Sequence, residues 1–252
     1  MRSDDEAAGR VLIVGASRGI GRATALELSK RGWDVGIGFS SNREAAEKLA
    51  AELRCDRANV LIQGDIAVDG CGIVAQAVAE LGGLDAVVVT AVPMITGPIE
   101  KITLADAQRA LAVTVHGFRE LALAASPHLA ARWGSIVAVS SLGSDRTVEF
   151  YGALGPAKAA LEATVRYLAI TLGRHHIRVN AVAPGMVDDV AHIEDAPHIA
   201  AVVPAIAKRT PLGRALPTPT DIAKTIAAVL SDDFAFVTGQ TIKIDGGYCL
   251  PL

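Results

Sequence analysis

Short apolar runs recur along the chain and are separated by longer amphipathic stretches. The run at residues 11–14 is short and ends in glycine, which is typical of a buried strand. The same reasoning predicts further strands at residues 35–39, 59–63, 86–90, 135–140, 177–183 and 241–244.

The amphipathic stretches between these runs predict helices. Residues 21–30 place Ala and Leu on one face, and Asn42 is a suitable N-cap for a helix over residues 42–53. The two longest predicted helices cover residues 104–131 and 151–173. Because strands joined by crossover helices form a parallel sheet covered on both faces, the pattern predicts an α/β fold. We expect one domain, since no repeat or linker interrupts the pattern.

Two segments fall outside this alternation. Residues 1–9 are polar and acidic and are expected to form a flexible tail before a domain spanning residues 10–252. Residues 186–219 are rich in proline and longer than an ordinary loop. Such a segment over a sheet edge predicts a substrate lid, with a loop that has no role in the site as the alternative.

Composition and charge narrow the classes of function. The chain is 51% hydrophobic and 20% charged, and its net charge of -3 gives no reason to expect nucleic acid or an anionic membrane as partner. The apolar runs are too short to cross a bilayer and the N-terminus has no apolar signal core, so a cytoplasmic protein is expected. The 3 cysteines are expected to be free thiols, and the 6 histidines form no metal pattern.

A glycine-rich loop connects the first predicted strand to the first predicted helix. Glycine allows a tight turn and a close approach of the backbone to a pyrophosphate, while the N-terminal end of the helix attracts an anion. The loop therefore predicts a Rossmann-type, doubly wound sheet, with a simple strand-to-helix turn as the alternative. The residues predicted to bind the cofactor here are Gly15, Ser17, Arg18, Gly19, Ile20 and Gly21.

The end of the second predicted strand indicates which dinucleotide binds. An acidic residue at this point would bind the ribose 2′-hydroxyl of NAD, but the strand is followed by no carboxylate before Glu44. Arg18 and the hydroxyls of Ser40 and Ser41 suit a 2′-phosphate, so NADPH is favoured over NADH. Arg43 either adds charge to that site or is a solvated helix residue.

Several motifs together resemble the short-chain dehydrogenase/reductase family. The resemblance covers residues 10–250 and rests on the glycine loop, Asp65-Ile66, Ser140-Ser141, Lys158, Pro184-Gly185 and the closing run at 239–247. The family usually has a tyrosine four residues before the lysine, but Leu154 stands there in this chain. The nearest tyrosine is Tyr151, and its Tyr-x6-Lys spacing to Lys158 resembles the NADPH-dependent enoyl-[acyl-carrier-protein] reductases.

The longer spacing fits a different chemistry. A ketoreductase protonates the oxygen of the carbon that receives hydride, whereas an enoyl reductase sends hydride to the β-carbon and negative charge appears on the thioester oxygen, two atoms away. The donor to that oxygen must therefore lie further from the hydride path. On one continuous helix, Tyr151 and Lys158 would share a face roughly 10 Å apart, against roughly 6 Å for the shorter spacing.

The resemblance implies a role for each of these residues. Tyr151 would hydrogen-bond the substrate carbonyl and stabilise the enolate, and Lys158 would hold the nicotinamide ribose hydroxyls. Ser141 stands at the position of the family's catalytic serine and would help to orient the substrate. The remaining contacts would come from Asp65 and Ile66 to adenine, and from Pro184 and Gly185 to nicotinamide.

Three positions depart from the family pattern. Thr90 to Pro93 replaces an Asn-Asn-Ala-Gly loop, and Thr114 replaces an asparagine. Asp189, or Asp188 if the loop shifts, stands where a threonine contacts the carboxamide. These changes indicate either a specialised substrate or weakened activity. Tyr167, nine residues after Lys158, is expected to face away from the site and to have a packing role.

The first interpretation is NADPH-dependent reduction of an enoyl thioester on acyl carrier protein or coenzyme A, in fatty-acid or secondary metabolism. The alternatives are a carbonyl or 3-oxoacyl reductase, against which Leu154 argues, and a non-catalytic dinucleotide-binding subunit. The two long helices have alanine-rich faces where this family forms dimers and tetramers, so a homotetramer is expected. The apolar lid favours a hydrophobic substrate.

Overall fold

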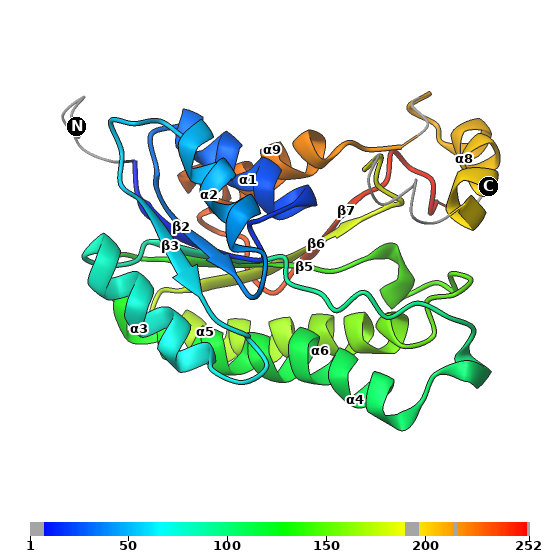
Figure 1. The fold of residues 1–252 in the computed structure, drawn as a ribbon, viewed down its shortest axis with the longest axis horizontal. Coiled ribbons are helices and arrows are strands. Elements are labelled where there is room, and N and C mark those ends of the chain that lie inside the picture. Colours follow the sequence, from blue (N-terminus) through cyan, green and yellow to red (C-terminus); the bar gives the residue numbers. More distant parts are fainter. Residues whose placement is uncertain (1–7, 190–196, 214–215, 251–252) are drawn as a thin grey trace.

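The protein is an α/β domain built on one parallel sheet of seven strands (Figure 1). The computed structural model describes residues 8–189, 197–213 and 216–250. The strand order is β3-β2-β1-β4-β5-β6-β7. The strands are β1 (Arg10–Val14), β2 (Asp34–Phe39), β3 (Asn59–Gln63), β4 (Ala86–Val89), β5 (Ser135–Val139), β6 (Arg178–Pro184) and β7 (Thr241–Ile244). The seven predicted strands and the predicted fold class are confirmed.

Helices cover both faces of this sheet. Figure 1 shows one layer of helices above it, made of α1 (Gly19–Lys30), α2 (Arg43–Glu52) and α9 (Pro219–Leu230). The layer below it is made of α3 (Gly70–Leu81), α4 (Leu104–Leu111), α5 (Phe118–Ala130) and α6 (Leu154–Gly173). The predicted cap of α2 is confirmed, because the Asn42 side chain accepts a hydrogen bond from the backbone N–H of Ala45 at 2.9 Å.

Two apolar cores hold these layers on the sheet. Below it, side chains of the sheet such as Leu12 pack with Phe118 and Leu121 of α5. Above it, Ile13 and Ile37 belong to a second cluster that also contains residues of α1 and α9. Since successive strand residues point to opposite faces, Leu12 and Ile13 anchor different layers. One core covers each face of the sheet, and together they fix the strand ends that carry the site.

The chain reverses its direction of winding at β1. This strand pairs with β2 on one side and with β4 on the other, so the connections after β1 and after β4 leave the sheet in opposite directions. Ligands of open α/β sheets bind in the crevice that forms at the carboxyl ends of the strands at such a point. The glycine loop after β1 lies in that crevice.

Both long predicted helices have other bounds in the structure than the sequence predicts. The predicted helix over residues 104–131 is interrupted, since residues 112–117 form a π-helical turn between α4 and α5. The predicted helix over residues 151–173 begins instead at Leu154. Phe150 has a φ of 61°, which no right-handed helix accommodates, and Tyr151 forms a parallel bridge with Gly97. The expectation that Tyr151 and Lys158 share one continuous helix is therefore wrong.

Parts of the predicted tail and lid lie outside the described residues, namely 1–7, 190–196 and 214–215. Within the predicted lid, α8 (Pro197–Arg209) is described and lies beyond the carboxyl ends of β6 and β7 (Figure 1). The role of this segment as a lid stays a prediction.

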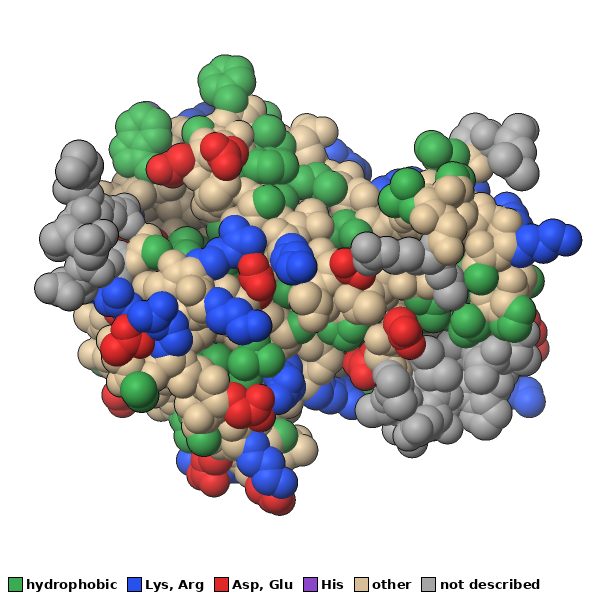
Figure 2. Space-filling view, turned by 90° about the horizontal axis from the view of Figure 1, so that it is seen from above, with side chains coloured by type: hydrophobic (Ala, Val, Ile, Leu, Met, Phe, Trp, Pro, Cys, Tyr) green, Lys and Arg blue, Asp and Glu red, His purple; other side chains and the backbone are tan. Residues whose placement is uncertain are grey.

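Charges of both signs are mixed over the upper helical layer. Figure 2 shows Lys and Arg side chains interspersed with Asp and Glu on this face, with apolar groups between them. Within the described ranges, no helix combines the length and hydropathy that a membrane span requires. The same residues contain no group of three or more metal-ligating side chains, and Cys55, Cys71 and Cys249 are free thiols there.

Candidate active site

A cavity of about 1340 Å³ opens at the carboxyl ends of the strands. It brings together nearly every residue predicted for the site, from the glycine loop to the start of α6 and the segment after β6. The predicted residues on its wall are Gly15, Ser17, Arg18, Gly19, Ile20, Gly21, Ser40, Asp65, Ile66, Ser141, Tyr151, Lys158, Pro184 and Gly185. Ser41 is the exception, because it is exposed and does not line the cavity.

The glycine loop has the shape of a phosphate cradle. Gly15 has a φ of 91° and donates its backbone N–H to the Gly38 carbonyl at 2.9 Å. A Cβ at Gly21 would lie 2.2 Å from the Gly15 carbonyl oxygen, so only glycine allows the first turn of α1 to approach the end of β1 this closely. The N-terminal turn of α1 therefore faces the cavity, and the residues present fit the pyrophosphate of a dinucleotide.

The two arginines near the predicted 2′-phosphate position differ in their surroundings. Arg18 is exposed on the cavity wall. Arg43 lies off the wall, donates to the Gln63 side-chain oxygen at 2.8 Å, and holds its guanidinium 5.4 Å from the centre of the Phe39 ring. Of the two alternatives for Arg43, the structure favours the solvated helix residue.

Asp65 is engaged by protein groups at the predicted adenine position. Its carboxylate accepts hydrogen bonds from the Arg109 guanidinium at 2.7 Å and from the Ala67 backbone at 3.0 Å. Partial burial raises the pKa of Asp65, but the hydrogen bonds from Arg109 and Ala67 outweigh it, so the pKa lies below its ordinary value. Ile66 is buried beside it. Asp65 is thus a fixed anion at the cavity wall.

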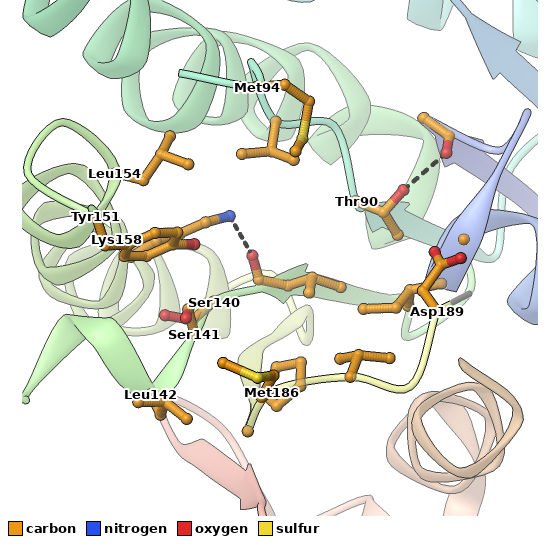
Figure 3. Close-up of a pocket in the computed structure, with 18 of the residues that line it drawn as sticks. Thr90, Met94, Ser140, Ser141, Leu142, Tyr151, Leu154, Lys158, Met186 and Asp189 are labelled. Carbon is orange, nitrogen blue, oxygen red and sulfur yellow. Dashed lines mark hydrogen bonds between the residues drawn. The ribbon is translucent and has the colours of Figure 1, made fainter. Parts of the chain in front are cut away.

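Lys158 is a buried cation at the end of β5. Its Nζ donates to the Val139 carbonyl at 2.7 Å (Figure 3), and one turn later Glu162 accepts a hydrogen bond from the Ser140 hydroxyl at 2.5 Å. Burial lowers the pKa of Lys158 from 10.5 to about 8, although the nearby Glu162 carboxylate opposes this shift. The ammonium group is held in place by the same strand end that carries the serines.

Tyr151 lies against the loop that follows β5. A Cβ on Gly143 would come within 2.6 Å of the Tyr151 ring, so glycine lets the ring lie against this loop. The pKa of Tyr151 is raised, because burial disfavours the phenolate more than the side-chain hydrogen bond with Ser141 favours it. Figure 3 shows Tyr151, Lys158 and Ser141 on the same side of the cavity. Tyr151 is therefore a neutral hydroxyl at ordinary pH.

Leu154 occupies the position that holds tyrosine in most of the resembled family. It is 2% exposed and belongs to an apolar cluster with Ala110, Ala153 and Ala157. Val92, Ile95, Ile102 and Tyr151 pack against this cluster. The wall beside Lys158 is therefore apolar at the point where a ketoreductase has its acid.

Replacing Leu154 with tyrosine is expected to lower the free energy of unfolding by about 1–3 kcal/mol, because the added ring overpacks a closed apolar cluster. Urea unfolding measures this change. The matched control is Leu212→Tyr, at a position 78% exposed and off the cavity wall. Equal stability of the Leu154→Tyr variant and the wild type would show that the cluster has room for a tyrosine.

The positions that depart from the family pattern have distinct surroundings. The Thr90 hydroxyl donates to the Gly15 carbonyl at 3.0 Å, so it supports the glycine loop. Thr114 is buried in the π-helical turn, and its hydroxyl has no hydrogen-bond partner among the described residues. Asp189 lies beside Gly19, on the side of the cavity away from Tyr151 (Figure 3).

Tyr167 faces away from the site, as predicted, but the predicted packing role is wrong. It lies off the cavity wall, but it is 79% exposed and packs little within this chain. The reason is its place on the outward face of α6, where neighbouring Arg166 is also exposed.

Two residues near the site were not identified from the sequence. Glu162 lies four residues after Lys158, a spacing that brings helical side chains together and was a usable signal. Arg109 pairs with Asp65 across 44 positions of sequence, and no local pattern indicates such a contact.

A glycine-loop anion site, a buried lysine and a tyrosine meet here at the carboxyl edge of a parallel sheet. This arrangement is that of a nicotinamide-dinucleotide oxidoreductase. A family model described as Enoyl-(Acyl carrier protein) reductase matches residues 15–249. The chain belongs to the short-chain dehydrogenase/reductase family, whose members bind NAD(H) or NADP(H).

Individual relatives catalyse different reactions. The chain is 34% identical over 244 residues to 1-cyclohexenylcarbonyl-CoA reductase of Streptomyces collinus. The match covers 94% of this chain and 85% of that protein. It is 34% identical over 248 residues to L-rhamnose 1-dehydrogenase (NAD(P)(+)) of a Sphingomonas species, with 94% of each chain covered. A short-chain dehydrogenase/reductase of Brucella melitensis superposes with a TM-score of 0.88 at 29% identity, covering 98% of this chain and 99% of that one.

Proposed function

We propose that this protein reduces the carbon–carbon double bond of an enoyl thioester with NADPH. The observation that carries the proposal is the buried Leu154 at the position of the usual tyrosine, with Tyr151 at the seven-residue spacing from Lys158. Burial raises the pKa of Tyr151, although the side-chain hydrogen bond with Ser141 opposes this shift. Such a hydroxyl stays protonated and serves as a hydrogen-bond donor to developing negative charge. The family model's description and the name of the Streptomyces relative support the same reaction class.

Each site residue has a defined task in this reaction. A bound NADPH would supply the hydride to the β-carbon of the substrate. Tyr151 donates a hydrogen bond to the thioester oxygen and so stabilises the enolate, which then takes a proton that comes from solvent at its α-carbon. Ser141 orients the Tyr151 hydroxyl, and Lys158 binds the ribose hydroxyls and places positive charge near that oxygen. The apolar wall around Leu154 keeps water away from the acyl group.

The main competing function is reduction of a carbonyl group. The Tyr151 hydroxyl, which is hydrogen-bonded with Ser141, could donate to the alkoxide oxygen of a carbonyl reduction as well as to an enolate oxygen. The Sphingomonas relative acts on a sugar, which supports this second candidate. Leu154 opposes it, because a buried aliphatic side chain fills the place of the usual acid.

Initial rates of NADPH oxidation with crotonyl-CoA and, separately, with acetoacetyl-CoA test the proposed function. We expect turnover with crotonyl-CoA and a specificity constant at least about a hundredfold lower with acetoacetyl-CoA. Preferred turnover of acetoacetyl-CoA would favour the carbonyl reductase. NADPH binding without turnover of either thioester would favour a dinucleotide-binding subunit.

The preference for NADPH is assigned to Arg18 and Ser40, which both line the cavity. Ser40→Asp is expected to raise the KM for NADPH at least about tenfold and to lower the KM for NADH, because a carboxylate there repels a 2′-phosphate and accepts from a 2′-hydroxyl. Ser41→Asp adds the same charge off the cavity wall and is the matched control. Equal effects of the two substitutions would show that Ser40 does not contact the ribose.

The substrate carrier and the assembly state are further parts of the proposal. The acyl group is carried on acyl carrier protein or coenzyme A. The homotetramer expected from the sequence stays a prediction, and it would use apolar side chains that α4 and α6 leave exposed. These side chains are Leu104, Leu111, Tyr167 and Ile170.

A further inference from the structure

Two arginines from distant parts of the chain line the cavity and contact adjacent residues of one turn. Arg146 belongs to the loop between β5 and α6, and Arg209 is the last residue of α8. Both line the cavity, together with Tyr248 from the turn that follows β7. None of these three residues has a task in the reaction described above.

Both guanidinium groups are held against the same C-terminal turn. Arg146 donates to the Cys249 carbonyl, and the Arg209 guanidinium lies 5.0 Å from the centre of the Tyr248 ring. The turn itself is fixed by Asp245, which accepts from the backbone N–H groups of Gly247 and Cys249 at 2.9 Å. We call Arg146 and Arg209 the arginine pair.

The arginine pair carries positive charge that the described residues do not neutralise. Neither arginine forms an ion pair in the described ranges. Asp145, which precedes Arg146 in the sequence, pairs with Lys243, and Asp245 accepts hydrogen bonds from the turn. Glu149 also lines the cavity and is exposed, and it forms no ion pair with any of the described residues.

The guanidinium groups keep donors available for a ligand. An arginine has five N–H donors in a planar fork, and Arg146 uses one side of that fork for the Cys249 carbonyl. The Arg209 guanidinium lies over the Tyr248 ring, and none of its N–H groups donates a hydrogen bond to the described residues. Two such forks match the geometry of a phosphate group.

The position of the arginine pair indicates which part of a substrate it meets. Both side chains are exposed, whereas Leu154 and Leu216 on the same wall are buried. An acyl chain is expected to lie along the buried apolar surface near Tyr151. The anion that reaches the arginine pair must then belong to the part of the substrate that extends from the cavity into solvent.

We propose that Arg146 and Arg209 bind the phosphate of the 4′-phosphopantetheine arm that carries the acyl thioester. This inference rests on the proposed enoyl-thioester function. The phosphate is common to coenzyme A and to acyl carrier protein, so the arginine pair recognises the arm and not the carrier. A carboxylate on the acyl chain fits less well, because it would have to lie against the buried apolar wall.

Two substrates that differ only in this phosphate test the proposal. KM and kcat are measured with NADPH for crotonyl-pantetheine and crotonyl-4′-phosphopantetheine. For the wild type, we expect the KM to be at least about tenfold lower for the phosphorylated substrate, with similar kcat. Arg146→Ala and Arg209→Ala are each expected to raise that KM about tenfold and to leave the KM for crotonyl-pantetheine unchanged.

The matched control is Lys208→Ala, which removes a positive charge from the same helix at a residue off the cavity wall. Crotonyl-CoA and crotonyl-acyl carrier protein distinguish the sources of the phosphate. Similar responses of both to Arg146→Ala would show recognition of the shared arm. If the variants fold poorly, the comparison of the two pantetheine substrates on the wild type still decides the proposal.

Two results would overturn the inference, and they can be told apart. Equal KM values of the wild type for the two pantetheine substrates would show that there is no phosphate subsite, and the proposed enoyl reduction would still stand. Absence of turnover with every crotonyl thioester would contradict the proposed function itself, and the phosphate subsite with it. If Lys208→Ala raises the KM for the phosphorylated substrate as much as Arg209→Ala does, the effect comes from overall charge and not from a specific site.

Discussion

Tyr151→Phe is expected to lower kcat for crotonyl-CoA by about 10²- to 10³-fold, which is the usual effect of removing one donor to a developing oxyanion. The substitution removes only the hydroxyl, and the ring still lies against Gly143. Because Tyr151 does not hold the dinucleotide in this account, the affinity for NADPH should stay within about twofold of the wild type.

Steady-state kinetics and NADPH fluorescence titration measure the two parts of this prediction. Tyr167→Phe is the matched control, since it removes a hydroxyl from an exposed tyrosine and should leave both quantities unchanged. A Tyr151→Phe enzyme that keeps most of its kcat would mean that another group, such as Ser141, donates to the thioester oxygen.

Lys158→Met is expected to abolish activity and to stabilise the fold at neutral pH. The lowered pKa, from 10.5 to about 8, corresponds to a cost of about 3 kcal/mol for burying the charge. Methionine fills a similar space without charge, but the Val139 carbonyl loses its partner, which costs about 1–2 kcal/mol. The net gain is then about 1–2 kcal/mol in the free energy of unfolding, measured by urea unfolding at pH 7.

The pH dependence of stability separates the charge of Lys158 from its packing. The folded pKa lies below the unfolded value, so the cost is fully present below about pH 8 and is relieved as the pH rises toward 10.5. The stability of the wild type relative to Lys158→Met should therefore rise across this window. In the free enzyme, kcat/KM should fall above about pH 8, because Lys158 loses the proton that binds the ribose. A constant stability difference from pH 7 to 10 would show that Lys158 titrates normally.

Local sequence patterns predict the part of the site that depends on local geometry. The spacing of glycines after β1 reflects a steric need, since a Cβ at Gly21 would meet the Gly15 carbonyl. The side chains at the ends of β5 and β6, including Ser141 and Pro184, follow from strand positions, because parallel strands end at one edge of the sheet. For this reason the cofactor side of the cavity was largely predictable.

The substrate side depends on contacts between distant segments, which local sequence patterns do not predict. The spacing predicts that Tyr151 lies on α6, but its bridge to Gly97 and the left-handed Phe150 hold it before the helix. The contact of Arg109 with Asp65 and the meeting of Arg146 with Cys249 also join segments far apart in the sequence. Hydrophobic periodicity carries no information about such pairs, since it reports only which face of an element is buried.

A competition experiment tests the central claim most directly. The enzyme receives NADPH deuterated at the transferred position, together with equal concentrations of crotonyl-CoA and acetoacetyl-CoA, and the products are analysed by mass spectrometry and NMR. We expect butyryl-CoA with deuterium on the β-carbon as the main product. Deuterated 3-hydroxybutyryl-CoA as the main product would contradict enoyl reduction and show that Tyr151 serves carbonyl chemistry.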